Sequence, residues 1–131
     1  MRSVDQDLIN ASICTSDGYG EHWLRHCIAN LEGIYINPSI AQLSTQYSGR
    51  TMIIVGAGPS LERNVEQLRK ARNNALIVCC SHALHALRDA DVRPHYVIAT
   101  DSQDVAHHFD NYDLSHLGGV IAGVSCHPKV W

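Results

Sequence analysis

Four short apolar runs, spaced roughly twenty to twenty-five residues apart, constrain the fold of this chain more than any other feature. Each run is about five residues long, contains Val and Ile, and lacks clean polar alternation. Such runs are typical of strands that are buried on both faces. The runs are Thr51–Val55, Ala75–Cys80, Tyr96–Thr100 and Val120–Val124. Their spacing leaves room for a crossover helix between successive strands, so it predicts a mainly parallel sheet.

The segments between these runs have the apolar spacing of helices. Between the first two runs, apolar residues recur three or four positions apart, at Leu61, Val65, Leu68 and Ala71. A second apolar stripe covers Ala83–Ala90, and Asp104–Asn111 is predicted to form a short third helix. Strands that alternate with helices indicate the α/β class and a Rossmann-like sheet with flanking helices. Such sheets usually continue for one or two further units, so we expect an incomplete domain.

The first 49 residues lack such runs and are predicted to be helical. Ser39 followed by Gln42 matches the capping-box pattern, which predicts a short helix that Gly49 closes. A longer helix is indicated by apolar residues at helical spacing, namely Trp23, Leu24, Cys27, Ile28 and Leu31. We therefore expect a helical lead-in over residues 1–49 that packs against the sheet, followed by a Rossmann-like domain over residues 50–131.

Composition and charge exclude several classes of protein. The chain has 131 residues and a formal net charge of −3, with no basic run. Nucleic-acid binding is therefore disfavoured, because it depends on clustered Lys and Arg. No apolar run approaches the roughly 20 residues of a membrane span, and the N-terminus has no signal-peptide pattern. The five cysteines form neither a CxxC pair nor a disulfide framework, which favours a reducing, cytoplasmic location.

A glycine-containing loop, Gly56-Ala57-Gly58-Pro59-Ser60, connects the first predicted strand to the first predicted helix. Glycine permits a tight turn with positive φ and lets a ligand approach the backbone closely. Pro suits the first turn of a helix, and the free N–H groups there attract anions. The loop therefore predicts a phosphate site to which the Ser60 hydroxyl adds a donor. It matches neither the P-loop nor the GxGxxG dinucleotide pattern. A tight turn without a ligand is the alternative.

Two further polar residues follow predicted strands and are expected at the same edge of the sheet. Asp101 follows the third run, where its carboxylate would hold a ribose, coordinate Mg²⁺ beside a phosphate or act as a base. Ser81 follows the second run. Helix capping is the alternative role for both residues. The nine histidines include closely spaced pairs, but no third ligand stands at a diagnostic spacing, so no metal site is predicted.

Taken together, these segments resemble a known protein family. The stretches IIVGAGPSLERNVEQL, ALIVCCSHALHAL and VRPHYVIATD are similar to the central domain of bacterial motility accessory factors, which glycosylate flagellin. The archaeal MptE-like 6-hydroxymethylpterin diphosphokinases share this domain, and the loop also resembles the Gly-Pro-Ser loop of CMP-sugar-dependent sialyltransferases. The resemblance implies nucleotide binding by Gly56, Gly58, Pro59 and Ser60, with Ser81 and Asp101 in matching polar positions. His95 departs from the family pattern, which has Asp there.

The resemblance leaves three functions open. The first is transfer of a CMP-activated nonulosonic sugar to a protein hydroxyl, with flagellin as an example of an acceptor and Asp101 near the reacting centre. The second is an ATP- and Mg²⁺-dependent pterin diphosphokinase, in which Asp101 becomes a candidate metal ligand. The third is a non-catalytic nucleotide-binding or scaffold fragment. Homo-oligomerisation is left open under each of them.

Overall fold

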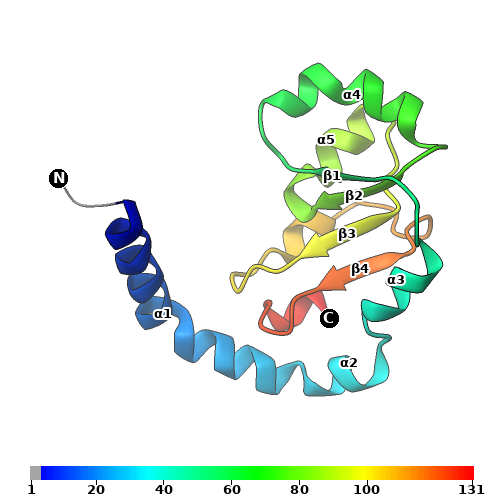
Figure 1. Ribbon diagram of the computed structural model, residues 1–131. Coiled ribbons are helices and arrows are strands. Elements are labelled where there is room, and N and C mark those ends of the chain that lie inside the picture. Colours follow the sequence, from blue (N-terminus) through cyan, green and yellow to red (C-terminus); the bar gives the residue numbers. More distant parts are fainter. Residues whose placement is uncertain (1–3) are drawn as a thin grey trace.

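A four-stranded parallel sheet forms the centre of the protein. The computed structural model describes residues 4–131. The strands are β1 (Met52–Val55), β2 (Leu76–Cys80), β3 (Tyr96–Ala99) and β4 (Gly119–Ala122). They pair in the order β1-β2-β3-β4, and every pair is parallel (Figure 1). The predicted α/β class and parallel sheet with flanking helices are confirmed, and each strand lies within or beside its apolar run.

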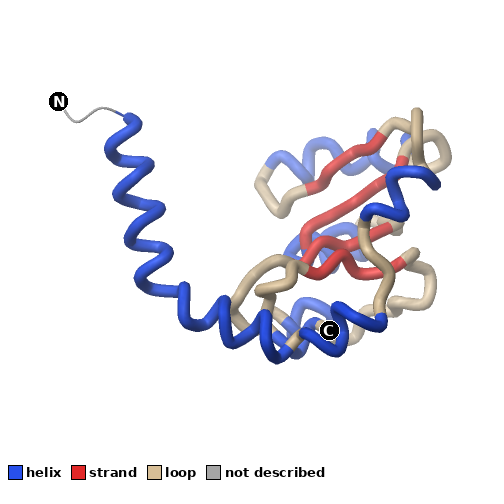
Figure 2. The backbone as a smooth tube through the Cα atoms, turned by 60° about the horizontal axis from the view of Figure 1, so that its bottom comes forward, coloured by secondary structure: helices blue, strands red, loops and turns tan. Residues whose placement is uncertain are grey.

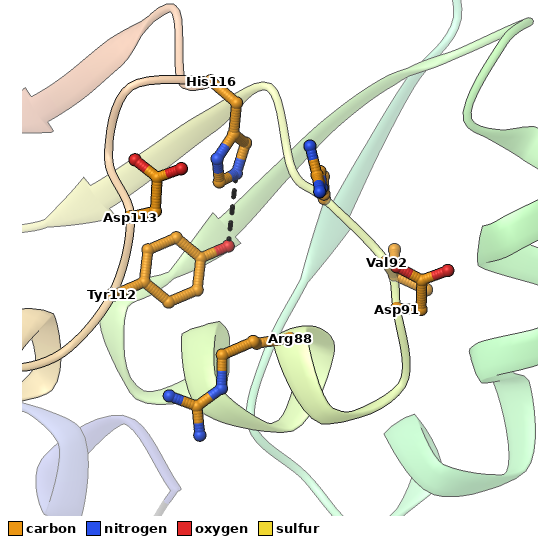
Figure 3. Close-up of a pocket in the computed structure, with 7 residues that line it drawn as sticks. Arg88, Asp91, Val92, Tyr112, Asp113 and His116 are labelled. Carbon is orange, nitrogen blue, oxygen red and sulfur yellow. Dashed lines mark hydrogen bonds between the residues drawn. The ribbon is translucent and has the colours of Figure 1, made fainter.

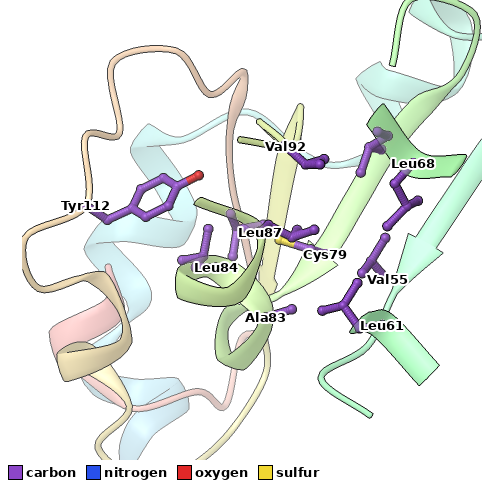
Figure 4. Close-up of a cluster of buried hydrophobic side chains, with 11 residues drawn as sticks. Val55, Leu61, Leu68, Cys79, Ala83, Leu84, Leu87, Val92 and Tyr112 are labelled. Carbon is purple, nitrogen blue, oxygen red and sulfur yellow. The ribbon is translucent and has the colours of Figure 1, made fainter. Parts of the chain in front are cut away.

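Two helices cover one face of this sheet. They are α4 (Ser60–Ala71) and α5 (Leu84–Asp89), which lie on the same side of the sheet in Figure 1. Their apolar side chains pack with inward-facing strand residues into the main core (Figure 4). That core contains Val55, Leu61, Leu68, Ile77, Cys79, Ala83, Leu84, Leu87, Val92, Val97 and Tyr112. Desolvation in this core raises the pKa of Cys79 to about 12, so this thiol acts as a small apolar side chain.

The predicted third helix is only a single 3₁₀ turn, Ala106–Phe109. Two local features limit its length. The Asp104 carboxylate accepts a hydrogen bond from the Ala106 N–H at 3.2 Å, which forms a side-chain turn before the segment. Asn111 then adopts a φ of 56°, in the left-handed region that ends helical structure.

The other face of the sheet is covered only in part. Leu43 of helix α3 (Ala41–Gln46), together with the adjacent Tyr47, packs against Leu76, Val78 and Tyr96. On β1, the side chains of this face are solvent-exposed: Met52 is 54% and Ile54 is 73% exposed. The prediction that every strand is buried on both faces is therefore wrong for β1. The sequential strand order places β1 at an edge of the sheet, where no helix of the described residues covers this face.

Helices α1 (Val4–Ala29) and α2 (Leu31–Ile36) precede the sheet, and α1 projects away from it. Helix α1 continues into α2, and both views show α1 extending away from the sheet (Figure 1 and Figure 2). The lead-in is helical as predicted, although residues 1–3 lie outside the described part. The predicted packing of the lead-in against the sheet is confirmed for Leu43 and Tyr47. It is wrong for Leu24 and Ile28 of α1, which are both more than 60% exposed. In the described part of the chain, no helix combines the length and hydropathy that crossing a bilayer requires.

A buried asparagine ties the end of α1 to the segment that follows β4. Asn30 lies between α1 and α2 and is only 2% exposed. Its side-chain amide donates to the carbonyl of Val124 at 3.1 Å and to that of Cys126 at 2.9 Å. These two bonds fix the end of α1 against the chain that follows β4.

Candidate functional site

Three of the predicted site positions lie in a row along the carboxyl edge of the sheet. Gly56 follows β1, Ser81 follows β2 and Asp101 comes two residues after β3. Because β1, β2 and β3 are parallel neighbours, these loops leave the sheet at the same edge. Adjacent strands lie about 4.8 Å apart, so the loops after β1 and β3 are about 10 Å apart.

The loop Gly56–Ser60 presents an open helix N-terminus. All five of its residues are exposed, and helix α4 begins at Ser60 with no side-chain cap. The Leu61 N–H donates to the Gly58 carbonyl at 2.9 Å, which closes the turn. Within the described chain, the Ser60 hydroxyl makes no hydrogen bond and is free to contact a ligand. Uncapped N–H groups at such an end, together with the helix dipole, favour an anion.

The two glycines of the loop leave space around the backbone and do not adopt positive φ. Positive φ among the glycines occurs at Gly49 and Gly119, so the prediction of a positive-φ turn at Gly56 and Gly58 is wrong. A Cβ atom built on Gly56 would meet nothing within 4 Å, and one on Gly58 would meet only the Ser60 hydroxyl oxygen, at 4.0 Å. The absent side chains therefore leave free space directly in front of α4, as close approach of a ligand requires.

Ser81 lies at the expected edge but already has a partner. It begins a 3₁₀ turn (Ser81–Ala83), is 5% exposed, and places its hydroxyl 3.0 Å from Nδ1 of His108. In the described chain, the side-chain contact of Ser81 is this one with His108 and not a helix cap. The predicted contact between Ser81 and a ligand stays a prediction.

A histidine cluster next to Ser81 was not predicted from the sequence. The ring centroids of His82 and His108 are 3.9 Å apart, and those of His107 and His108 are 4.3 Å apart. His82 follows β2, whereas His107 and His108 follow β3, so neighbouring parallel strands bring them to one edge. That adjacency of the two strand-end segments is the signal that sequence reasoning could have used. Among the described residues, no group of three His, Cys, Asp or Glu side chains is arranged to hold a metal ion.

The Asp101 side chain is exposed, and one of its two carboxylate oxygens accepts a hydrogen bond. One carboxylate oxygen accepts a hydrogen bond from the Gln103 N–H at 2.9 Å, which forms a local side-chain turn. The Asp101 carbonyl accepts from the His127 N–H at 2.9 Å, which ties this loop to the segment after β4. The second carboxylate oxygen has no hydrogen-bond partner within the described chain. It is therefore available to a ligand hydroxyl or to a proton.

Titration of His108 gives the protein a testable pH dependence. Burial lowers the pKa of His108 from its ordinary value of 6.5, neighbouring His82, His107 and His85 lower it further, and Asp101 opposes them. As the pH falls below 6.5, this histidine therefore binds a proton in the unfolded chain before it does so in the folded protein. Proton binding then favours unfolding, so stability that is present above pH 6.5 is lost as the pH falls toward the lowered pKa of His108. We expect the free energy of unfolding from urea titrations to decrease as the pH falls from 7 towards 5.

The variant His108→Gln supplies the control for this pH dependence. Glutamine still offers a hydrogen-bonding group to Ser81 but does not titrate, so the decrease should become shallower. It should not vanish, because burial and the nearby Arg72 and Arg50 also lower the pKa of His95. An unchanged slope in the variant would contradict the assignment to His108.

A hollow with a volume of about 150 Å³ lies away from these residues (Figure 3). It is lined by residues that precede β3 and β4, so it belongs to the amino edge of the sheet. Inside it, the Tyr112 hydroxyl lies 3.4 Å from Nε2 of His116. Basic and acidic side chains share its lining, including Arg88, Asp91 and Asp113. None of the predicted site residues lines this hollow, and its mixed charge favours no particular ligand.

The chain is similar to a known protein family over most of its length. The family model described as "6-hydroxymethylpterin diphosphokinase MptE-like" matches residues 25–130, which include the whole sheet and the loop Gly56–Ser60. The chain belongs to the MptE-like family. The matched range also begins within α1, so the family resemblance extends into the helical lead-in.

The chain is also similar to a bacterial protein. The chain is 30% identical over 108 residues to a protein of Treponema pallidum (strain Nichols) described as uncharacterized. The match covers 82% of this chain and 50% of the relative, so the chain spans about half the length of that protein. No solved structure matches the chain significantly.

Proposed function

We propose that this MptE-like domain binds a nucleotide phosphate at the loop Gly56–Ser60. The observation that carries the proposal is the free space in front of the uncapped N-terminus of α4. Backbone N–H groups and the Ser60 hydroxyl would donate hydrogen bonds to the phosphate, strengthened by its charge. The sugar attached to that phosphate would extend along the carboxyl edge towards Asp101.

The favoured donor is a CMP-activated nonulosonic sugar, which carries a single phosphate. The loop contains no Lys, and Asp101 is the one carboxylate at the predicted positions, so a triphosphate with Mg²⁺ would find few ligands here. This supports direct recognition of one phosphate by N–H and O–H donors. A transferase of this type would pass the sugar to a hydroxyl group of a protein such as flagellin.

The chemistry of that transfer assigns separate roles to the two ends of the site. The acceptor hydroxyl attacks the anomeric carbon of the sugar, and the bond from that carbon to the phosphate oxygen breaks. CMP leaves with the electron pair, and the N–H groups of the loop stabilise its developing charge. The free carboxylate oxygen of Asp101 takes the acceptor proton as a general base.

An ATP-dependent pterin diphosphokinase is the second candidate, and the description of the matching family model favours it. In that reaction, the pterin hydroxyl attacks the β-phosphate of ATP, and AMP leaves. Asp101 would then coordinate Mg²⁺ or accept the proton of the attacking hydroxyl.

Isothermal titration calorimetry of the folded chain separates these candidates. We expect CMP and a CMP-sugar to release heat with saturable binding, and ATP with Mg²⁺ to bind more weakly. Binding of ATP with Mg²⁺ but not of CMP would replace the first candidate with the second. No saturable binding of either nucleotide would contradict both and leave a scaffold role.

A further inference from the structure

A cationic hollow lies at the amino edge of the sheet, opposite the candidate nucleotide loop. Its volume is about 320 Å³, within the range of small-molecule sites. The lining residues follow α3 and α4 or lie at and before the starts of β1, β2 and β3. They are Tyr47, Arg50, Arg72, Asn73, Ala75, Leu76 and His95. No carboxylate is among them.

The two arginines of this hollow lack acidic partners. In the part of the chain that the structure describes, neither Arg50 nor Arg72 forms an ion pair, whereas Arg25, Arg69 and Arg88 each pair with a carboxylate. Arg72 uses only its Nε, which donates to the Arg93 carbonyl at 3.2 Å. Two uncompensated guanidinium groups around one hollow repel each other, and an anion between them would relieve that repulsion.

His95 adds a third donor with a defined orientation. The Ile77 N–H donates to Nδ1 of His95 at 2.9 Å, and the His95 N–H donates to the Ile77 carbonyl at 2.8 Å. Nδ1 therefore carries no proton, and the neutral ring has its N–H at Nε2. Burial, then Arg72 and Arg50, lower the pKa of His95, so the ring is neutral near pH 7 and both guanidinium groups are close to it.

We propose that Arg50, Arg72 and His95 form a binding site for the phosphate group of a small molecule. Guanidinium groups match phosphate oxygens in geometry and charge. Phosphate is favoured over carboxylate because it offers three oxygens to the three donor groups and up to two negative charges to the two guanidinium groups, whereas a carboxylate carries one charge. Tyr47 and Leu76 would contact the rest of the molecule. This site is independent of the nucleotide loop, from which it is separated by the length of the strands, about 13 Å.

NMR titration with inorganic phosphate, observed at the amide and histidine ring signals, tests the site directly. We expect saturable shifts of the Leu76 and Ile77 amide signals and of the His95 ring signals. Acetate, used as a second probe, should bind more weakly. Shifts confined to Gly56–Ser60 would overturn this inference while supporting the nucleotide loop, so the two proposals fail separately. Absence of shifts at Leu76, Ile77 and His95 at millimolar phosphate would also overturn it.

Charge-removing variants complete the test. The double variant Arg50→Gln/Arg72→Gln should weaken phosphate binding at the amino edge by about tenfold or more, since it removes two charged donors. The matched control is Arg63→Gln/Lys70→Gln, which also removes two positive charges, from exposed positions of α4 outside the hollow. Its affinity should stay within about twofold of the parent. Equal losses in both variants would mean that only the overall charge attracts phosphate, and the site would be rejected.

Discussion

Replacing Gly58 with valine is expected to abolish nucleotide binding while leaving the fold intact. The space around a Cβ at this position is empty except for the Ser60 hydroxyl oxygen at 4.0 Å. A branched side chain would fill the volume that the phosphate needs and separate the ligand from the loop N–H groups. Loss of two charge-assisted hydrogen bonds corresponds to a decrease in affinity of about 100-fold or more. Calorimetric titration with CMP measures it.

The same variant should keep its stability, which separates binding from folding. Gly58 has no positive φ, so valine meets no backbone strain there. The free energy of unfolding from urea titrations should change by less than about 1 kcal/mol. Gly18→Val is the matched control, because a Cβ at Gly18 in α1 also meets nothing within 4 Å. If Gly58→Val bound CMP as tightly as the parent, the loop would not be the phosphate site.

The strands and the carboxyl-edge loop were predictable because their signals are local. An uninterrupted apolar run followed by Gly-Ala-Gly-Pro-Ser requires only neighbouring residues to indicate a strand, a turn and a helix start. The order of the strands is different, because it depends on which distant runs pair. Sequence patterns placed β1 among fully buried strands, but the pairing leaves it at an edge with Ile54 exposed.

The polar contacts that organise the site were predictable only in part. Asp101 and Ser81 were placed at the correct edge, since each follows a strand of a parallel sheet. The contact between Ser81 and His108 joins residues 27 positions apart, and no local pattern indicates it. Asn30 likewise has no distinguishing sequence context, yet its amide bonds two carbonyls more than ninety residues away. Such contacts emerge from tertiary packing, which spacing rules do not capture.

Ile77→Ala and Ile54→Ala form a matched pair for which we expect very different losses of stability. The two residues occur in similar apolar runs, but Ile77 is 0% exposed on central strand β2 and Ile54 is 73% exposed on β1. Removing the Ile77 side chain leaves a cavity between the sheet and its helices and should cost about 3–4 kcal/mol in urea titrations. Ile54→Ala should cost less than about 1 kcal/mol, since it removes exposed atoms.

The outcome for Ile54 also tests whether the bare face of β1 is exposed in solution. A loss as large as that for Ile77, together with a dependence of stability on protein concentration, would mean that another polypeptide surface covers β1. A small loss without concentration dependence supports an exposed edge strand in the isolated chain. An exposed apolar edge of this kind favours pairing with a further strand.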